Sequence, residues 1–119
     1  MLRSLFLLVG VCLAASVAMA QDPVKVDPQH YKVIFENDQV RVLRIHYGPH
    51  EKSVMHVHPN AVVVYESEAH VKMTTPDGKS VESNGKAGET AWTPAGAHLP
   101  ENVGEKPVDA VLVELKTSH

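Results

Sequence analysis

From Tyr31 onward, apolar and polar positions alternate along the chain in short runs that turn residues interrupt. Alternation with a period of two, carried by β-branched residues, is typical of strands with one buried face. The breaks contain turn-forming pairs such as Gly48-Pro49, Asp77-Gly78 and Asn84-Gly85. No segment sustains a helical period over ten residues. The pattern predicts strands over residues 31–36, 39–47, 53–58, 61–67, 70–75, 80–83, 90–93 and 109–116.

Many short strands at near-regular spacing indicate an all-β fold, a small antiparallel β-barrel or sandwich. The stretch 21–30 is polar and contains Pro23 and Pro28, and it is expected to be an extended arm. Residues 31–119 are then expected to form one domain, because about a hundred residues support one modest core. No internal repeat or second domain is evident.

The first twenty residues have the pattern of a secretory signal peptide. A basic residue, Arg3, precedes an apolar run, and the small residues Ala18 and Ala20 fit the cleavage site, so cleavage after Ala20 is predicted. The protein is accordingly expected to be periplasmic or secreted, with no membrane association after the signal is removed. The alternative is an uncleaved membrane anchor, which a run this short supports poorly.

Composition narrows the function classes. The single cysteine, Cys12, lies in the predicted signal, so the exported chain has no disulfide and depends on burial, or on burial and a metal. The formal net charge is −3, no basic cluster is present, and aromatic residues make up 5% of the chain. These values argue against nucleic-acid binding, which needs a cationic surface and often stacking side chains.

Eight histidines are the chemically notable feature of the chain. His56 and His58 are one residue apart in a predicted strand, so both side chains lie on one face, roughly 6–7 Å apart at the backbone. Both imidazoles can then reach one ion at about 2.0–2.1 Å. By position, His30, His50 and His119 are expected to be solvated, whereas His46 and His70 lie on strands that could face either way.

A second motif lies downstream. The stretch "GETAWTPAGAHLPEN" carries, in order, Gly88, Pro94, Gly96, His98 and Asn102. This order resembles the second motif of the cupin superfamily, G-x5-P-x-G-x2-H-x3-N, with one residue fewer before the histidine. His56 and His58 resemble the H-x-H of the first cupin motif. That motif is degraded here, because Val62 stands in its glutamate slot. The resemblance implies a small single-domain cupin, a jelly-roll barrel.

The resemblance also implies one divalent metal ion, bound by His56, His58 and His98. Cupins of this kind use Fe, Mn, Zn, Ni or Cu, and imidazoles alone do not select among them. Three neutral ligands with open positions are typical of a catalytic ion and favour a small, anionic ligand or substrate. Glu101 and Tyr65 are candidates for proton transfer or for contact with a bound oxygen, and His46 is a candidate fourth ligand.

Several functions remain open at this point. The chain could be a metalloenzyme such as a dioxygenase, isomerase or lyase, because the fold does not fix the reaction. It could instead be a non-catalytic barrel that carries a metal ion or a small ligand. A third alternative is a metal-free structural domain that forms a homodimer, in which His56 and His58 are buried residues of a lost site.

Overall fold

The computed structural model describes residues 21–117, which fold into one short helix and nine strands. The expected strands all form, some with shifted ends, and β8 is an additional strand. The elements are α1 (Pro23–Val26), β1 (Tyr31–Glu36), β2 (Val40–Tyr47), β3 (His56–His58), β4 (Ala61–Tyr65), β5 (Ala69–Thr74), β6 (Ser80–Gly85), β7 (Thr90–Thr93), β8 (Gly96–Asn102) and β9 (Val108–Leu115).

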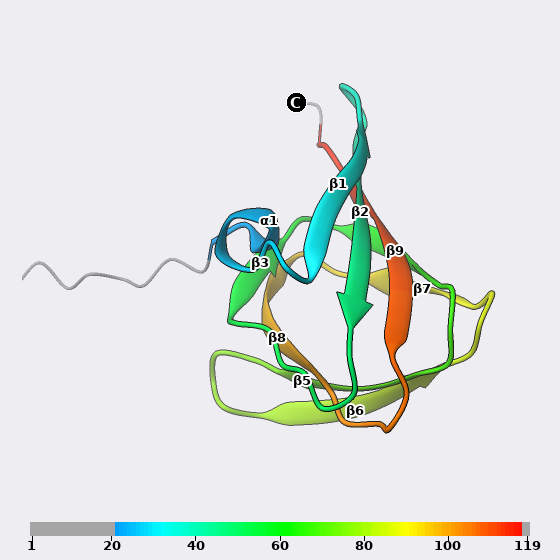
Figure 1. The fold of residues 1–119 in the computed structure, drawn as a ribbon. Coiled ribbons are helices and arrows are strands. Elements are labelled where there is room, and N and C mark those ends of the chain that lie inside the picture. The colour runs from blue at the N-terminus through cyan, green and yellow to red at the C-terminus, as the bar shows by residue number, and fades with distance from the viewer. Residues whose placement is uncertain (1–20, 118–119) are drawn as a thin grey trace, which may run out of the picture.

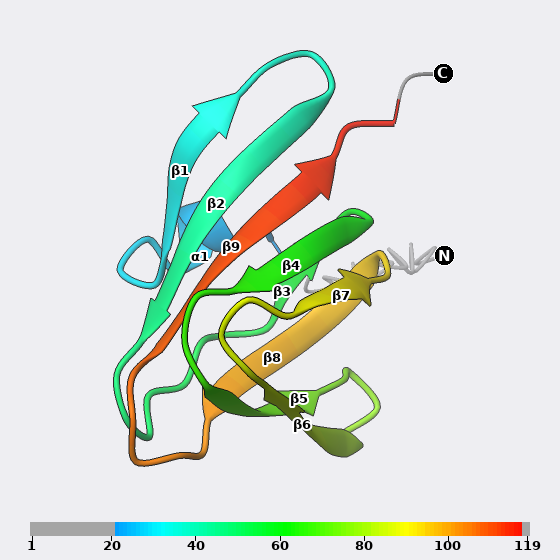
Figure 2. The same cartoon turned by 90° about the vertical axis from the view of Figure 1, so that its right-hand side faces the viewer.

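The strands form two antiparallel sheets that face each other around one core (Figures 1 and 2). One sheet has the order β1-β2-β9-β4-β7, and the other has the order β3-β8-β5-β6. Figure 2 shows the long β2 and β9 strands running side by side, with β4 and β7 next to β9 and with β8 beyond them in the second sheet. The predicted all-β barrel is therefore confirmed.

The core lies between the sheets and follows the strand period. In β9, every second residue is buried, beginning with Val108, Ala110 and Leu112, and the residues between them are only half-buried. Leu43 and Ile45 of β2 face the same interior. Each fully buried valine, leucine or isoleucine side chain contributes roughly 1.5–3 kcal/mol through its removal from water.

The segment 21–30 is not the extended arm that its prolines suggested. Asp22 caps α1, since its carboxylate accepts a hydrogen bond from the Val24 amide at 2.9 Å, and Pro23 occupies the first turn. Pro23, Asp27 and His30 are buried. The predicted signal peptide, residues 1–20, and His119 lie outside the described residues.

β8 is the strand that the sequence pattern missed. Pro94 and Gly96 are residue types that favour a turn, and Pro100 weakens any strand pattern. The chain bends at Ala95, but the strand begins at Gly96 itself, and β8 then lies between β3 and β5 in the second sheet. Its central position decides where His98 points.

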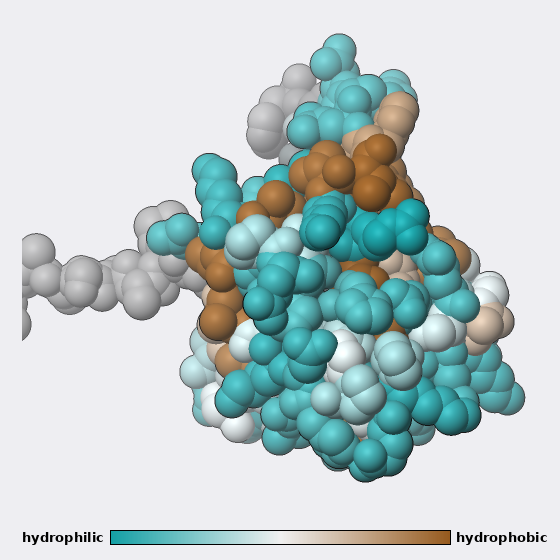
Figure 3. Space-filling view, in the orientation of Figure 1, coloured by the Kyte–Doolittle hydropathy of each residue, from teal (hydrophilic) through white to brown (hydrophobic). Residues whose placement is uncertain are grey.

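The surface seen in Figure 3 is mostly hydrophilic over the barrel, with hydrophobic side chains gathered toward the β1–β2 hairpin. β1 is an edge strand, and its Val33, Ile34 and Phe35 are exposed. The homodimer suggested by the sequence stays a prediction. Across residues 21–117, no helix has the length and apolar character needed to cross a bilayer.

Candidate metal centre

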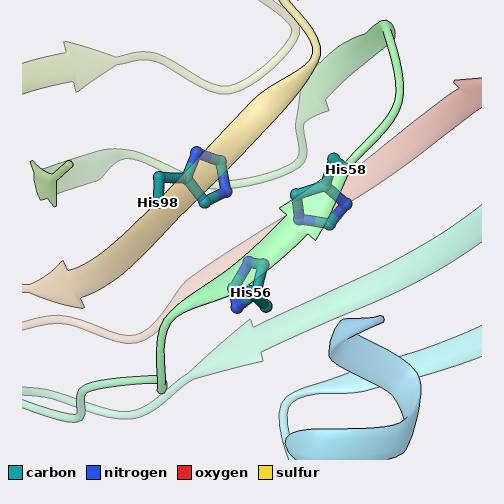
Figure 4. Close-up of side chains that lie close together, drawn as sticks. All are labelled: His56, His58 and His98. Atoms are coloured by element: carbon teal, nitrogen blue, oxygen red, sulfur yellow. The ribbon is translucent and has the colours of Figure 1, made fainter. Parts of the chain in front are cut away.

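Three imidazoles meet inside the barrel, and they come from two neighbouring strands. In the β3–β8 ladder, His56 is the direct cross-strand partner of His98, and His58 is the partner of Gly96. The ring centroids are 4.7 Å apart for His56 and His58, and 4.9 and 5.1 Å for the pairs with His98. One nitrogen from each ring lies within 4.8 Å of the others. Figure 4 shows the rings converging.

The environment keeps His56 and His98 neutral. His56 and His58 are buried and His98 is half-buried. Burial and the neighbouring His58 lower the pKa of His56 to about 4. Burial, His58 and His56 lower the pKa of His98 to about 3. A neutral imidazole has a lone pair on one nitrogen, and this neutral form is the one that binds a metal ion.

His56 presents its Nε2 atom to the cluster. Its Nδ1 lies 2.8 Å from the carbonyl oxygen of Val54, which can only accept, so Nδ1 carries the proton. The Ser53 hydroxyl lies 3.2 Å from the same Nδ1. The Nε2 atom is therefore unprotonated, and it is buried without a hydrogen-bond partner in the described residues. A buried polar atom without a partner is costly and requires an explanation.

His58 is oriented by a carboxylate that sequence reasoning missed. Its Nδ1 donates to Oε2 of Glu114 at 2.7 Å, which leaves Nε2 free. Glu114 is buried in β9, and its Oε1 accepts from Nε of Arg41 at 2.6 Å. Burial alone raises the pKa of Glu114, but the hydrogen bonds from His58 and Arg41 outweigh it and lower that pKa. The signal was available: Glu114 shares the strand face of Leu112 and Ala110.

A second hydrogen-bond network supports His56 from the N-terminal segment. The Ser53 hydroxyl donates to Asp27 at 2.5 Å, and Asp27 accepts from Nδ1 of His30 at 2.8 Å. His30, expected to be solvated, is thus buried. Both of its ring nitrogens have carboxylate partners, Asp27 at Nδ1 and Glu51 at 3.2 Å from Nε2. The network fixes the loop that leads into β3, and His56 is the first residue of that strand.

Two tyrosines close the cluster on the side of β1 and β2. The ring of Tyr31 lies edge-on to His56 at a centroid distance of 4.9 Å. Its hydroxyl is hydrogen-bonded to that of Tyr47 at 2.5 Å. Burial raises the pKa of both Tyr31 and Tyr47, so the phenols stay protonated.

An apolar cavity of about 80 Å³ adjoins His58 and His98. It continues into a wider groove of about 600 Å³ that shares the walls Val63, Tyr65 and His98 and extends to Trp92. Val63 lines the cavity, whereas Val62, which was assigned to the glutamate slot, does not. The period of two turns Val62 toward the outer face of β4, so Val63 occupies the wall position. Neither valine offers a ligand.

The two candidate catalytic residues have different positions. Tyr65 lines the cavity, and burial raises its pKa. Glu101 alternates with the buried Pro100 and Asn102 in β8, so it points away from the interior, and it lies 3.5 Å from the ammonium of Lys72. The structure therefore brings Tyr65 to the candidate site and leaves Glu101 outside the cavity.

The remaining histidines lie apart from the cluster. His46, a candidate fourth ligand, is about half exposed and pairs with Asp109 at 2.7 Å on the outer face of the sheet. It is therefore not a ligand to an ion at the cluster, because its place in β2 turns it outward. His50 pairs with Glu105, and His70 pairs with Glu82, both at the surface.

Comparison with solved structures identifies the fold. No family model matches the chain, and no curated protein is similar enough to count as a relative. The described fold is similar to the crystal structure of a cupin domain from Bordetella pertussis, with 27% identity and a TM-score of 0.68. The match covers 73% of this chain and 92% of that one. This chain is a cupin-superfamily domain.

Two other solved structures share the fold. A double-stranded β-helix protein from Klebsiella pneumoniae has 23% identity and a TM-score of 0.56, over 74% of this chain and 84% of that one. The polyketide cyclase RemF from Streptomyces resistomycificus has 14% identity and a TM-score of 0.54, over 71% and 63%. The predicted cupin resemblance is confirmed.

Within this cupin, the three histidines fit a transition-metal ion. All three offer an imidazole nitrogen, and the hydrogen bonds of Nδ1 in His56 and His58 leave Nε2 of each ring to face the cluster. A divalent ion held by these three ligands would keep open coordination positions and would supply Lewis-acid chemistry there. The apolar cavity adjoins His58 and His98, so a small molecule would reach those positions from it.

Proposed function

We propose that this protein is an exported cupin metalloenzyme with one divalent transition-metal ion, acting on a small anionic molecule. His56, His58 and His98 hold the ion. The observation that carries the proposal is the Nε2 atom of His56, a buried lone pair without a hydrogen-bond partner that faces two more imidazoles. An ion accepts all three lone pairs at once and removes the cost of burying them.

The charge of the candidate site favours an anionic ligand. Among the residues that line the cavity and the groove, Glu89 in the groove is the only Asp, Glu, Lys or Arg. Three neutral imidazoles leave a divalent ion with its full charge, so the ion attracts carboxylates, enolates or thiolates. The apolar walls strengthen that attraction, because they exclude water.

The shape of the site limits the size of the reacting group. A cavity of about 80 Å³ accommodates only a few non-hydrogen atoms, since one water occupies roughly 30 Å³ of the liquid. The rest of a larger molecule lies in the groove toward Trp92. Tyr65, on the wall shared by both spaces, is placed to donate a hydrogen bond to the bound molecule.

A second candidate is a metal or ligand carrier without turnover. It is favoured by the lining of the inner cavity, which contains no carboxylate, amine or thiol side chain. An enzyme needs a group that gives or takes a proton in most of the reactions that cupins carry out. With His58 and His98 engaged as ligands, only tyrosines such as Tyr65 remain in the cavity for that role.

Metal analysis tests the proposal. We expect about one equivalent of a transition metal in protein purified from its native compartment, and none in His56→Ala or His98→Ala. His70→Ala, at a surface histidine, is the matched control and keeps the metal. The proposal is overturned if the wild-type protein retains no metal after it has been loaded with each of Fe(II), Mn(II), Zn(II), Ni(II) and Cu(II).

Turnover separates the enzyme from the carrier. The metal-loaded protein is assayed for oxygen uptake and product formation against thiols, diketones and small carboxylic acids. Turnover that His98→Ala abolishes supports the enzyme, and metal binding without turnover across the panel favours the carrier. Export is tested by the N-terminal sequence of the purified protein, which is expected to begin at Gln21.

A further inference from the structure

Glu114 is a buried anion with both oxygens engaged. Its side chain is 2% exposed, its Oε2 accepts from His58 at 2.7 Å, and its Oε1 accepts from Arg41 at 2.6 Å. Since both donors are fixed, the carboxylate has one orientation, and its hydrogen bond sets the ring plane of His58. No such contact reaches His98 among the described residues.

Arg41 is itself held from the other side by the N-terminal segment. Its Nη1 lies 2.6 Å from Oδ2 of Asp22, and its Nη2 lies 3.0 Å from Oδ1, which is a bidentate pair. The resulting chain runs from Asp22 through Arg41 and Glu114 to His58. It contains two carboxylates and one guanidinium, so it places a net negative charge behind the ring.

We propose that Glu114, held by Arg41 and Asp22, is a positioning residue that aims His58 at the ion and supplies the negative charge that the Val63 wall lacks. The inference rests on the proposed function. A carboxylate on the far nitrogen of a ligating imidazole fixes its tautomer and raises its basicity, and its loss typically lowers metal affinity by 10–100-fold.

The energetics of the pair between the buried Glu114 and the half-buried Arg41 support a role beyond stability. A buried ion pair gains little over a well-packed apolar pair, because desolvation offsets its attraction. Glu114 and Arg41 could thus be replaced by apolar residues at little cost if they served the core alone. The contact with His58 gives the buried carboxylate a use that an apolar side chain cannot fulfil.

Metal affinity and the spectrum of bound cobalt test the inference. Glu114→Gln keeps the shape and removes the charge, and we expect its dissociation constants for Ni(II) and Co(II) to rise 10–100-fold, with an altered visible spectrum of bound Co(II). Asp22→Asn removes the charge that pairs with Arg41 and keeps a residue type that can cap α1, and it is expected to raise them by a few-fold. Asp38→Asn, in the exposed β1–β2 turn, is the control and binds as wild type does.

The outcomes separate this inference from the proposed function. If wild type binds no metal, the proposed function fails. If wild type binds, His98→Ala does not, and Glu114→Gln keeps the wild-type affinity and cobalt spectrum, the positioning role alone is overturned, even if the melting temperature falls. If Glu114→Gln does not fold, Asp22→Asn decides, and an unchanged affinity in that variant overturns the inference.

Discussion

His56 of β3 and His98 of β8 are directly paired across two antiparallel strands, although 42 positions separate them in the numbering of the chain. Directly opposed residues share a sheet face, so His98 projects to the same side as His56 and His58. The cluster is therefore a product of strand register, and its ring separations of 4.7–5.1 Å follow from that pairing.

Removing His98 is expected to abolish stabilisation by metal. In wild type, free ion at 100 times its dissociation constant raises the free energy of unfolding by about 2.7 kcal/mol. His98→Ala leaves two ligands, so its melting temperature in Ni(II) should equal that in chelator. His46→Ala, at an outward-facing ring, serves as the control and should retain the full shift. A metal-dependent shift of wild-type size in His98→Ala contradicts the assigned ligand set.

Restoring a carboxylate to the cavity wall is expected to tighten metal binding. Val63→Glu places an anionic oxygen beside His58 and His98, and the added charge should lower the dissociation constant by roughly tenfold or more. Val62→Glu, one residue earlier, projects to the outer face and should leave it unchanged. Competition titration against a chelator measures both variants. The reverse ranking would show that Val62 is the wall residue.

Stability of the metal-free protein is expected to fall as the medium becomes acidic. Burial and neighbouring histidines depress the pKa of His56 to about 4 and of His98 to about 3, against about 6.5 in the unfolded chain. Between these values the unfolded state binds protons that the folded state does not. The free energy of unfolding therefore has its full value above pH 6.5. It declines as the pH falls below 6.5, by on the order of 2–4 kcal/mol at pH 5.

Urea unfolding at pH 7 and pH 5, in chelator, measures this decline. His98→Gln should lose roughly half of it, because one of the two titrating rings is gone, whereas His70→Gln should keep all of it. An equal decline in His98→Gln and wild type would mean that other groups cause the acid sensitivity.

The ring of Tyr65 depends on the absence of a side chain at Gly85. A Cβ atom there would lie 2.7 Å from two ring carbons, closer than any van der Waals contact. Gly85→Ala is therefore expected to lower the free energy of unfolding by about 1–3 kcal/mol and to displace Tyr65 from the cavity wall. Gly104→Ala, whose Cβ meets nothing nearer than 3.4 Å, is the control for denaturant unfolding. An equal loss in both variants would argue against the contact.

Alternation and turn residues were sufficient to predict most of the fold and two of the three clustered histidines. Apolar and polar residues alternate along much of β2, and His56 and His58 share a face by the period of two alone. His98 was reached only through its motif, because the strand that carries it has Gly96 at its start and Pro100 within it, both unfavourable in strands. The pairing on both sides of β8 overrides those local preferences.

The residues behind the ligands were harder to predict. Glu114 could have been found as a carboxylate on the apolar face of β9, and Asp22-Pro23 is a recognisable helix start. The role of Arg41 could not have been predicted, because its partners come from distant segments that only the folded chain brings together. The cavity wall was assigned to Val62 instead of Val63 for another reason. All residues of "AVVV" are apolar, so their composition does not distinguish the inner face of the strand from the outer face.

β3 is a strand of three residues at the margin of its sheet, where it meets β8 through three residue pairs and receives one further backbone contact from Gln21. We expect so short a strand to detach from its sheet locally while the rest of the barrel stays folded. An ion bound by His56, His58 and His98 would cross-link β3 to β8 through side chains, in addition to the backbone pairs. Loading with metal should then slow hydrogen exchange at the Val57 amide far more than at amides deep within β2 or β9.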